Sequence, residues 1–328
     1  MRDWPGPGGA AGAAGMPLLP GVVAQGHTRD RLSVRLCLTR WWDRLRGQSP
    51  DPAAAEPRAP SDPCVAPRWQ GSDQLELSRS GLPLCDAVVN LAGENVLNPL
   101  RRWSDAFCRE VISSRVETTK TLAKAIAAAE QPPRAWVLVT GVGYYRPSPT
   151  AEYTEDSPGG DFDFFSRLVS SWEAAALIPG SPTRGVVVRS GVVLGRDGGA
   201  IAQMLLPFRL GLGGPMGSGL QPFPWIHIQD LSGIVCHALE KESVQGILNG
   251  VAPSSPGTSN GSFARELAAA LGRPALVPVP GWAVRAVFGA ERAVMLLEGQ
   301  RVLPKRTLET GYHFIFPELP AALRDIVA

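Results

Sequence analysis

The sequence predicts an α/β fold: a doubly wound, Rossmann-like parallel sheet with helices on both faces, followed by a small and mainly helical C-terminal domain. From about residue 82 onward, apolar runs of strand length alternate with longer helical segments, which is the pattern of βαβ units. The strand-like runs are apolar almost throughout, as strands covered on both faces are. The N-terminal part lacks this pattern, so we expect the Rossmann-like fold to be incomplete or altered there.

Residues 1–75 are expected to form a divergent, largely irregular segment. Gly and Pro are frequent in stretches such as 5–9, and residues 53–60 are low in complexity. Proline removes a backbone donor and glycine adds chain entropy, so strands and long helices are both disfavoured. The exception is 32–45, where the spacing of apolar residues suggests a helix.

The rest of the chain divides into a Rossmann-like nucleotide-binding domain at 76–253 and a small C-terminal domain at 254–328. Strands are expected at 85–93, 135–141, 184–194, 224–228 and 246–251, and helices at 104–129, 164–176 and 230–240. The carboxyl ends of parallel strands meet at one edge of the sheet, where ligands bind in such folds. The loops 90–95, 140–145 and 190–196 are therefore expected to form one ligand-binding cleft.

The composition argues against several kinds of partner and site. With 32 basic and 30 acidic residues, the net charge of +2 gives no reason to expect binding to nucleic acid or to an acidic membrane surface. The cysteines are scattered and the histidines form no cluster with them, so no metal site is expected. No apolar stretch is long enough to cross a bilayer. We expect a cytoplasmic protein, with a mitochondrial or a nuclear location as the alternatives.

Several motifs, spread over roughly residues 80–328, resemble those of one family. They are Asn90-Leu91-Ala92-Gly93-Glu94-Asn95, Ser114-Arg115-Val116-Glu117-Thr118-Thr119, Val142-Gly143-Tyr144-Tyr145, Trp172-Glu173-Ala174-Ala175, Arg189-Ser190-Gly191-Val192-Val193-Leu194-Gly195 and Trp225-Ile226-His227-Ile228-Gln229-Asp230-Leu231. Together they resemble the NAD-dependent epimerase/dehydratase family, an atypical branch of the extended short-chain dehydrogenase/reductases. The end of the chain resembles that family's small C-terminal domain of unknown function. The resemblance implies an oxidoreductase that uses NADP(H) on a small-molecule substrate.

The resemblance also implies which residues hold the cofactor. The family's Asn-Leu-Ala-Gly loop, which lies along the dinucleotide, falls on Asn90, Leu91, Ala92 and Gly93, and small residues there let the backbone approach the cofactor closely. By its sequence alone, this loop could equally be a plain turn at the end of a strand.

Three further positions match cofactor-binding positions of the family. They are Glu110 and Arg115 on the helix that follows the loop, and Val193 beside the nicotinamide. An arginine could meet a phosphate through charge-assisted bonds. The alternatives from the residues alone are two solvated helix charges and a core valine.

The phosphate-binding loop departs from the family pattern. An extended dehydrogenase begins with a strand, then Gly-x-x-Gly-x-x-Gly, then a helix whose N-terminus carries the pyrophosphate. The spacing occurs at Gly9, Gly12 and Gly15, but no strand precedes it and two prolines interrupt the segment after it. We therefore interpret this glycine spacing as fortuitous, and part of the first Rossmann unit as replaced.

The catalytic residues depart as well. Reductases of this superfamily use Ser or Thr together with Tyr-x-x-x-Lys, and those Tyr and Lys positions fall on Phe165 and Val169, which cannot transfer a proton or carry a charge. Thr140 is left as the catalytic candidate, although a strand-end hydroxyl also caps backbone. Tyr145 and His227 are candidate substrate contacts, with aromatic packing and a buried histidine as the alternatives. Asp230 is expected to cap a helix beginning at the next residue.

Three interpretations of function remain open. The chain is an NADP(H)-dependent oxidoreductase, a non-catalytic regulatory protein that binds NADP(H), or a variant that has lost cofactor binding together with its phosphate loop. The missing Tyr and Lys favour the second interpretation, and the altered N-terminus favours the third.

Overall fold

The computed structural model describes residues 21–25, 68–69, 82, 84–196, 198–254 and 257–328. Its centre is a six-stranded parallel sheet in the order β2–β1–β3–β4–β6–β9. These strands are β1 (Gly21–Gln25), β2 (Arg68–Trp69), β3 (Ala87–Leu91), β4 (Ala135–Gly141), β6 (Arg184–Ser190) and β9 (Gly246–Gly250). The sheet confirms the predicted α/β fold class.

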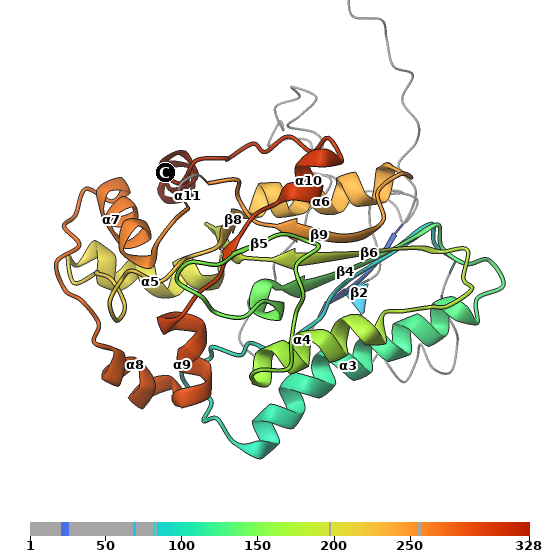
Figure 1. The fold of residues 1–328 in the computed structure, drawn as a ribbon, viewed down its shortest axis with the longest axis horizontal. Helices are drawn as coiled ribbons and strands as arrows, with labels where there is room; N and C mark the ends of the chain where they lie inside the picture. Colours follow the sequence, from blue (N-terminus) through green and yellow to red (C-terminus); the bar gives the residue numbers. More distant parts are fainter. Residues whose placement is uncertain (1–20, 26–67, 70–81, 83, 197, 255–256) are drawn as a thin grey trace, which may run out of the picture.

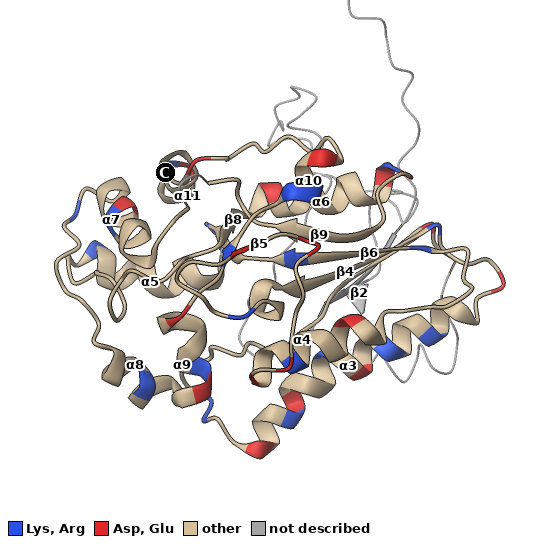
Figure 2. Ribbon diagram, in the orientation of Figure 1, with Lys and Arg blue, Asp and Glu red and all other residues tan. Residues whose placement is uncertain are grey.

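Helices cover both faces of the sheet (Figure 1). On one side lie α3 (Asp105–Ala127) and α4 (Phe164–Ala175), and on the other lies α6 (Ile228–Glu240). The buried stripe of α3 packs with Trp136 and Leu138 of β4 and with Trp172 of α4. On the opposite face, Ile234 and Val235 of α6 pack against the sheet. Burying each such large apolar side chain contributes about 1.5–3 kcal/mol. Acidic and basic residues are interspersed along α3 (Figure 2).

The order of the strands reverses between β1 and β3. The chain passes from β1 outward to β2 and then returns to the other side of β1, where β3 pairs with it from Gly21↔Ala87 to Gln25↔Leu91. In open α/β sheets, such a switch point opens a crevice at the carboxyl ends of the strands, and ligands bind there. The residues just beyond Leu91 therefore lie at the expected binding edge.

Two sheet strands, β1 and β2, lie within residues 1–75, for which the sequence predicts a largely irregular segment. The glycine spacing of Gly9–Gly15 and the expected helix at 32–45 lie outside the described residues. The glycine spacing precedes β1 in the sequence, whereas a phosphate loop would follow the first strand.

The prediction of one continuous strand at 184–194 is wrong, because the chain turns at Gly191. Gly191 N bonds to Gly250 O at 3.0 Å, whereas Val192 N bonds to Pro224 O at 2.8 Å. A Cβ at Gly191 would lie 2.7 Å from Pro224 O, so only glycine allows this close approach. The next strand, β7 (Val192–Gly195), therefore pairs in a separate sheet with β8 (Trp225–His227).

The expected start of α6 is also wrong. The helix begins at Ile228, two residues before the expected range 230–240, and its N-cap is His227, whose Nδ1 accepts from Gln229 N at 3.2 Å. Asp230 lies in the first turn and accepts instead from Ile315 N at 2.7 Å and Phe316 N at 2.9 Å. In the sequence, Asp230 has the features of an N-cap, so the helix start is predicted too late. The actual hydrogen-bond partners of Asp230 come from the far end of the chain, which no local pattern reveals.

The C-terminal part is mainly helical, as predicted. It contains α7 (Asn260–Ala270), α8 (Gly281–Phe288), α9 (Ala290–Leu297), α10 (Lys305–Glu309) and α11 (Leu319–Val327). Together with α5 (Gly199–Arg209), helices α7 and α11 form a second core around Phe263 and Leu323. The short strand β10 (Arg301–Val302) pairs with β5 (Glu152–Tyr153), which ties this region to the Rossmann-like part. Among the described residues, no helix combines the length and apolarity needed to span a bilayer.

Candidate cofactor and active site

The loop after β3 is shaped by Asn90, whose side chain is fully buried. Its Nδ2 donates to Thr119 Oγ1 at 2.8 Å, and its Oδ1 accepts from Ala92 N at 2.9 Å. The amide thus folds the loop onto α3 through internal hydrogen bonds. Leu91 ends β3, and Ala92 and Gly93 follow it at the carboxyl edge of the sheet, beside the switch point.

Arg115 lies directly beside this loop. Its Nη2 donates to Glu94 O at 2.9 Å and its Nη1 to Val111 O at 3.3 Å, while the guanidinium stacks over Trp172. A Cβ at Gly93 would lie 2.9 Å from Arg115 Cζ, so the loop and the guanidinium are in close contact. Burial lowers the pKa of Arg115 to about 10, which leaves it charged at neutral pH.

Two carboxylates near the loop differ in their surroundings. Glu110 is exposed on α3 and forms an ion pair with Arg101 at 2.6 Å. Glu94 is buried and was not among the predicted site residues. Burial, followed by the charge of Glu110, raises the pKa of Glu94. The sequence signal that could have indicated Glu94 is its place inside the family motif at residues 90–95.

The carboxyl ends of β4 and β6 carry a buried polar network. Thr140 Oγ1 donates to Glu173 Oε1 at 3.1 Å, and Arg189 binds the same carboxylate through Nε at 2.8 Å and Nη2 at 2.7 Å. Arg189 Nη1 donates to the hydroxyl of Tyr145 at 3.0 Å, and that hydroxyl donates to Asn249 Oδ1 at 2.9 Å. The structure thus joins Thr140 and Tyr145, two predicted site residues, through Glu173 and Arg189.

The charges of this network are nearly sealed from water. Arg189 is 1% exposed, and its guanidinium lies 3.3 Å from the centre of the Tyr144 ring. Burial alone would lower the pKa of Arg189, but the bonds to Glu173 outweigh burial and raise it. Tyr145 is 0% exposed, and burial raises the pKa of its phenol. Tyr145 is thus a buried member of the network, which fits the alternative of a packed aromatic residue.

Phe165 and Val169, which stand at the expected Tyr and Lys positions, are both buried on α4. Phe165 belongs to the core with Phe107 and Trp172, and its Cβ lies 3.7 Å from the Cβ position of Gly143, in the 3₁₀ turn η1 (Val142–Tyr144) after β4. This side of α4 therefore still faces the end of β4, but with apolar groups.

Val193 and His227 lie on neighbouring strands, β7 and β8, away from the Arg115 loop in sequence. Val193 is partly buried against the core that contains Ile234. His227 is buried: its Nε2 lies 3.3 Å from Asp325 Oδ2 and its ring lies 4.0 Å from that of Phe316. Burial lowers the pKa of His227, so the neutral form is favoured. Its contacts are internal, which fits the packing alternative.

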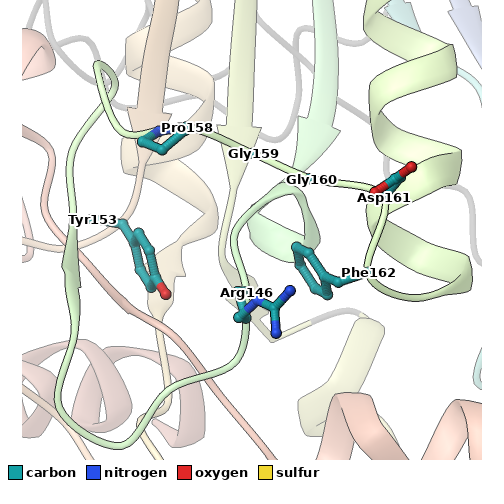
Figure 3. A pocket seen from close by; sticks show the side chains of 7 residues that line it. All are labelled: Arg146, Tyr153, Pro158, Gly159, Gly160, Asp161 and Phe162. Atoms are coloured by element: carbon teal, nitrogen blue, oxygen red, sulfur yellow. The ribbon is translucent and has the colours of Figure 1, made fainter.

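A pocket of about 280 Å³ lies beyond β4, in the segment that leads to α4. Its lining residues are Arg146, Tyr153, Pro158, Gly159, Gly160, Asp161 and Phe162 (Figure 3). The Arg146 guanidinium lies 4.9 Å from the centre of the Phe162 ring. The sequence predicts none of these lining residues, and its nearest signal is Tyr145, beside Arg146. Within the described part of the chain, no three His, Cys, Asp or Glu side chains are grouped as a metal site requires.

Known proteins share both the sequence and the fold. A family model for a domain of unknown function, DUF1731, matches residues 279–326. The bovine epimerase family protein SDR39U1 is 70% identical over 80% of this chain and 90% of its own length. The chloroplastic homologue from Arabidopsis thaliana is 40% identical over 74% of this chain and 68% of its own length.

One solved structure resembles the whole arrangement. It is the crystal structure of human SDR39U1, isoform 2, with NADPH. That chain is 57% identical to this one, with a TM-score of 0.78, and the match covers 93% of this chain and 98% of the human chain. In the human protein the fold is thus observed with a bound dinucleotide.

Proposed function

Because the chain belongs to the epimerase family of extended short-chain dehydrogenase/reductases, we propose that it is an NADP(H)-dependent oxidoreductase acting on a small molecule rather than on nucleic acid or a membrane. The observation that carries this proposal is the cationic Arg115 held against the glycine loop at the switch point of the sheet. The NADPH bound by the human relative supports it.

The residues at the switch point fit a dinucleotide. The hydrogen-bond acceptors of Arg115 are two backbone carbonyls and the Ser114 hydroxyl, and the nearby Glu94 carboxylate acts on it through its charge without a hydrogen bond, so the guanidinium can still form charge-assisted bonds to a phosphate. Gly93 keeps the loop free of a side chain that would collide with the guanidinium. In this proposal the backbone of Leu91–Gly93 lies along the cofactor and Val193 lies beside the nicotinamide.

Thr140 is the proposed catalytic residue. NADP(H), when bound, supplies or accepts the hydride. Thr140 Oγ1 donates its hydrogen bond to Glu173, so its oxygen accepts a hydrogen bond from a substrate hydroxyl. When the substrate is oxidised, its hydroxyl proton passes to Thr140 as the Thr140 proton passes to the Glu173 carboxylate, and reduction returns the protons along the same path. Glu173 is held in place by two bonds from Arg189 and so fixes the orientation of the Thr140 hydroxyl. Glu173 and Arg189 are positioning residues.

A non-catalytic NADP(H)-binding regulator is the second candidate function. The burial of Phe165 and Val169 favours it, because the usual proton donor and its lysine are replaced by core side chains. The third candidate is a variant without cofactor binding. A phosphate loop and its helix span roughly 20 residues and need several glycines in the loop. Only one glycine, Gly26, occurs among the 21 residues that follow β1.

A cofactor titration tests the binding proposal. We expect NADPH to quench tryptophan fluorescence saturably, and Arg115→Gln to weaken that binding about 10-fold or more, as expected for a lost charge-assisted bond. Arg109→Gln, a matched change on the exposed side of the same helix, should bind like the wild type. Absence of binding at millimolar NADPH would leave only the third interpretation.

A turnover assay separates an enzyme from a regulator. NADP and NADPH are offered with a panel of alcohols, ketones and sugar nucleotides, and the nicotinamide absorbance is followed. We expect turnover of at least one compound and a loss of about 100-fold or more in kcat for Thr140→Ala. Tight NADPH binding without turnover of any compound would favour the regulator, and unchanged kcat in Thr140→Ala would remove its assigned role.

We also propose a cytoplasmic location, with the mitochondrion or the nucleus as the alternatives. The Arg-containing N-terminal part keeps the mitochondrial alternative open, and the plant relative is named as chloroplastic. Cell fractionation of the full chain with a C-terminal tag would decide among them.

A further inference from the structure

The walls of the Arg146 pocket (the pocket of about 280 Å³ between Arg146 and Phe162) are shared with the buried polar network. Tyr153 stacks on Tyr145 with ring centres 5.2 Å apart and planes 17° apart. A Cβ at Gly159 would lie 2.1 Å from Tyr144 Cζ, so the loop backbone lies flat against the ring that also carries Arg189. A ligand in this pocket is therefore one layer of side chains away from the Thr140 network.

The pocket presents a cation without an acidic partner. Among the described residues, Arg146 forms no ion pair or hydrogen bond, and its guanidinium contacts the Phe162 ring. The other charged lining residue, Asp161, lies on the far side of Phe162 and extends away from the guanidinium (Figure 3). The Tyr153 hydroxyl likewise has no hydrogen-bond partner in the described part of the chain. Two donors and an aromatic face thus surround the space.

The pocket is already held open by the C-terminal region. Tyr153 lies in β5, which pairs with β10 at Val302↔Tyr153, and Arg301 forms an ion pair with Glu152 at 3.0 Å. Gln300 Nε2 also donates to Tyr145 O at 3.0 Å. Binding to such a preformed site costs little ordering of the chain.

We propose that the Arg146 pocket binds a small, planar carboxylic acid, at a site that one layer of side chains separates from the Thr140 network. A guanidinium matches a carboxylate with two parallel donors, and the Phe162 and Tyr153 rings suit a flat, unsaturated skeleton. Pockets for drug-sized ligands measure about 300–1,000 Å³, so 280 Å³ suits a molecule about the size of one ring.

Calorimetric titration with benzoate tests the pocket directly. We expect saturable binding in the millimolar range, and at least about 10-fold weaker binding of benzamide, which has the same shape without the charge. Acetate, which has the charge without the ring, should also bind more weakly. Absence of benzoate binding, or equal binding of benzamide, overturns the proposal; equal binding of acetate overturns the planar part of it.

Variants assign the binding to this pocket. Arg146→Gln should weaken benzoate binding about 10-fold or more. Arg134→Gln is the matched control, because Arg134 is exposed just before β4, at the opposite end of the strand that leads to the pocket. Phe162→Leu should weaken benzoate binding while leaving acetate binding unchanged. Unchanged benzoate binding in Arg146→Gln overturns the proposal, provided that circular dichroism shows the same fold.

The same samples separate this inference from the proposed function. If Arg146→Gln binds NADPH normally but loses benzoate, both stand. If NADPH fails to bind the wild type while benzoate binding depends on Arg146, the oxidoreductase proposal fails and the acid site remains as a binding site. If NADPH binds and Arg146→Gln binds benzoate like the wild type, the pocket proposal fails and the oxidoreductase proposal stands.

Discussion

At the carboxyl edge of this sheet, Thr140 and Tyr145 belong to one hydrogen-bonded network, although the sequence indicates them by two separate signals. The sequence points to Thr140 by its place at a strand end, and to Tyr145 by its place in the following loop. Neither prediction includes Glu173 and Arg189, although both lie inside motifs of the family. Arg189 is 16 residues from Glu173 and 44 residues from Tyr145 along the chain. No local sequence pattern encodes pairings over such distances.

The Glu173–Arg189 pair is expected to stabilise the protein strongly only while both partners are present. Replacing Arg189 with Met leaves Glu173 nearly buried and without its counter-charge, which should lower the free energy of unfolding by about 3–5 kcal/mol. The double variant with Glu173→Gln should recover part of this loss, because no buried charge remains. Urea unfolding followed by circular dichroism measures both changes, and a loss below about 1 kcal/mol in the single variant would contradict the role assigned to the pair.

At the scale of secondary-structure elements, the domain of unknown function contacts the loop proposed to bind the cofactor. Helix α9 supplies Arg292, which is 1% exposed. Its Nη1 donates to Val96 O at 3.2 Å and to Asn98 O at 3.0 Å, both in the loop beyond β3, and its Nε donates to Phe288 O at 2.6 Å. The neighbouring Glu291 accepts from the Trp103 indole. The C-terminal region thus braces the segment that follows the proposed cofactor loop.

Loss of the Arg292 brace should therefore affect stability and cofactor binding together. Arg292→Met removes a donor from three carbonyl oxygens; Asn98 O keeps its bond from Arg101 N, whereas the carbonyl of the buried Val96 loses this bond, and a buried unpaired group costs about 1–3 kcal/mol. We expect the free energy of unfolding to fall by at least about 2 kcal/mol and NADPH binding to weaken several-fold, because the loop beyond Gly93 loses its support.

The matched control is Arg285→Met on the exposed side of α8, which should change neither quantity. Benzoate binding in the Arg146 pocket should survive in Arg292→Met, since that pocket is held by β10 rather than α9. Equal unfolding free energies for the Arg292 and Arg285 variants would refute the brace.

At the scale of the whole molecule, the end of the chain returns to the Rossmann-like part. Asp230 of α6 binds the backbone of Ile315 and Phe316 and the hydroxyl of Tyr312, and His227 faces Asp325 of α11. These buried polar contacts link the two predicted domains through their cores. We infer that acid would lower the stability of both parts of the chain together.

The buried His227 and the partly buried His237 are expected to lower the stability as pH decreases below neutrality, against the opposite contribution of Glu94 and Glu240, whose pKa values burial raises. Burial lowers the pKa of His227 in the folded chain, so the unfolded chain binds the proton more readily. The stabilising effect of the neutral ring is then complete above the unfolded pKa of about 6.5 and is lost as pH falls toward the folded value. His237 shifts in the same direction, also mainly through burial.

Urea unfolding at neutral and at mildly acidic pH measures this dependence. The variant His227→Gln removes the titrating ring, so its unfolding free energy should change less between the two pH values than that of the wild type. His313→Gln is the control, since His313 is exposed. A wild type equally stable at both pH values would contradict the expectation.

The sequence by itself determined the α/β class, the strands β3, β4 and β9, the long helix α3 and the helical C-terminal region, because these follow from local periodicity and end signals. It also located the loop from Asn90 to Gly93 at the carboxyl edge. The tertiary structure decided what a local pattern does not contain: the break at Gly191, the start of α6, and the partners of Arg115, Arg189 and Arg292. A buried charge is stable only where distant backbone and side chains converge on it, and that convergence exists only in the folded chain.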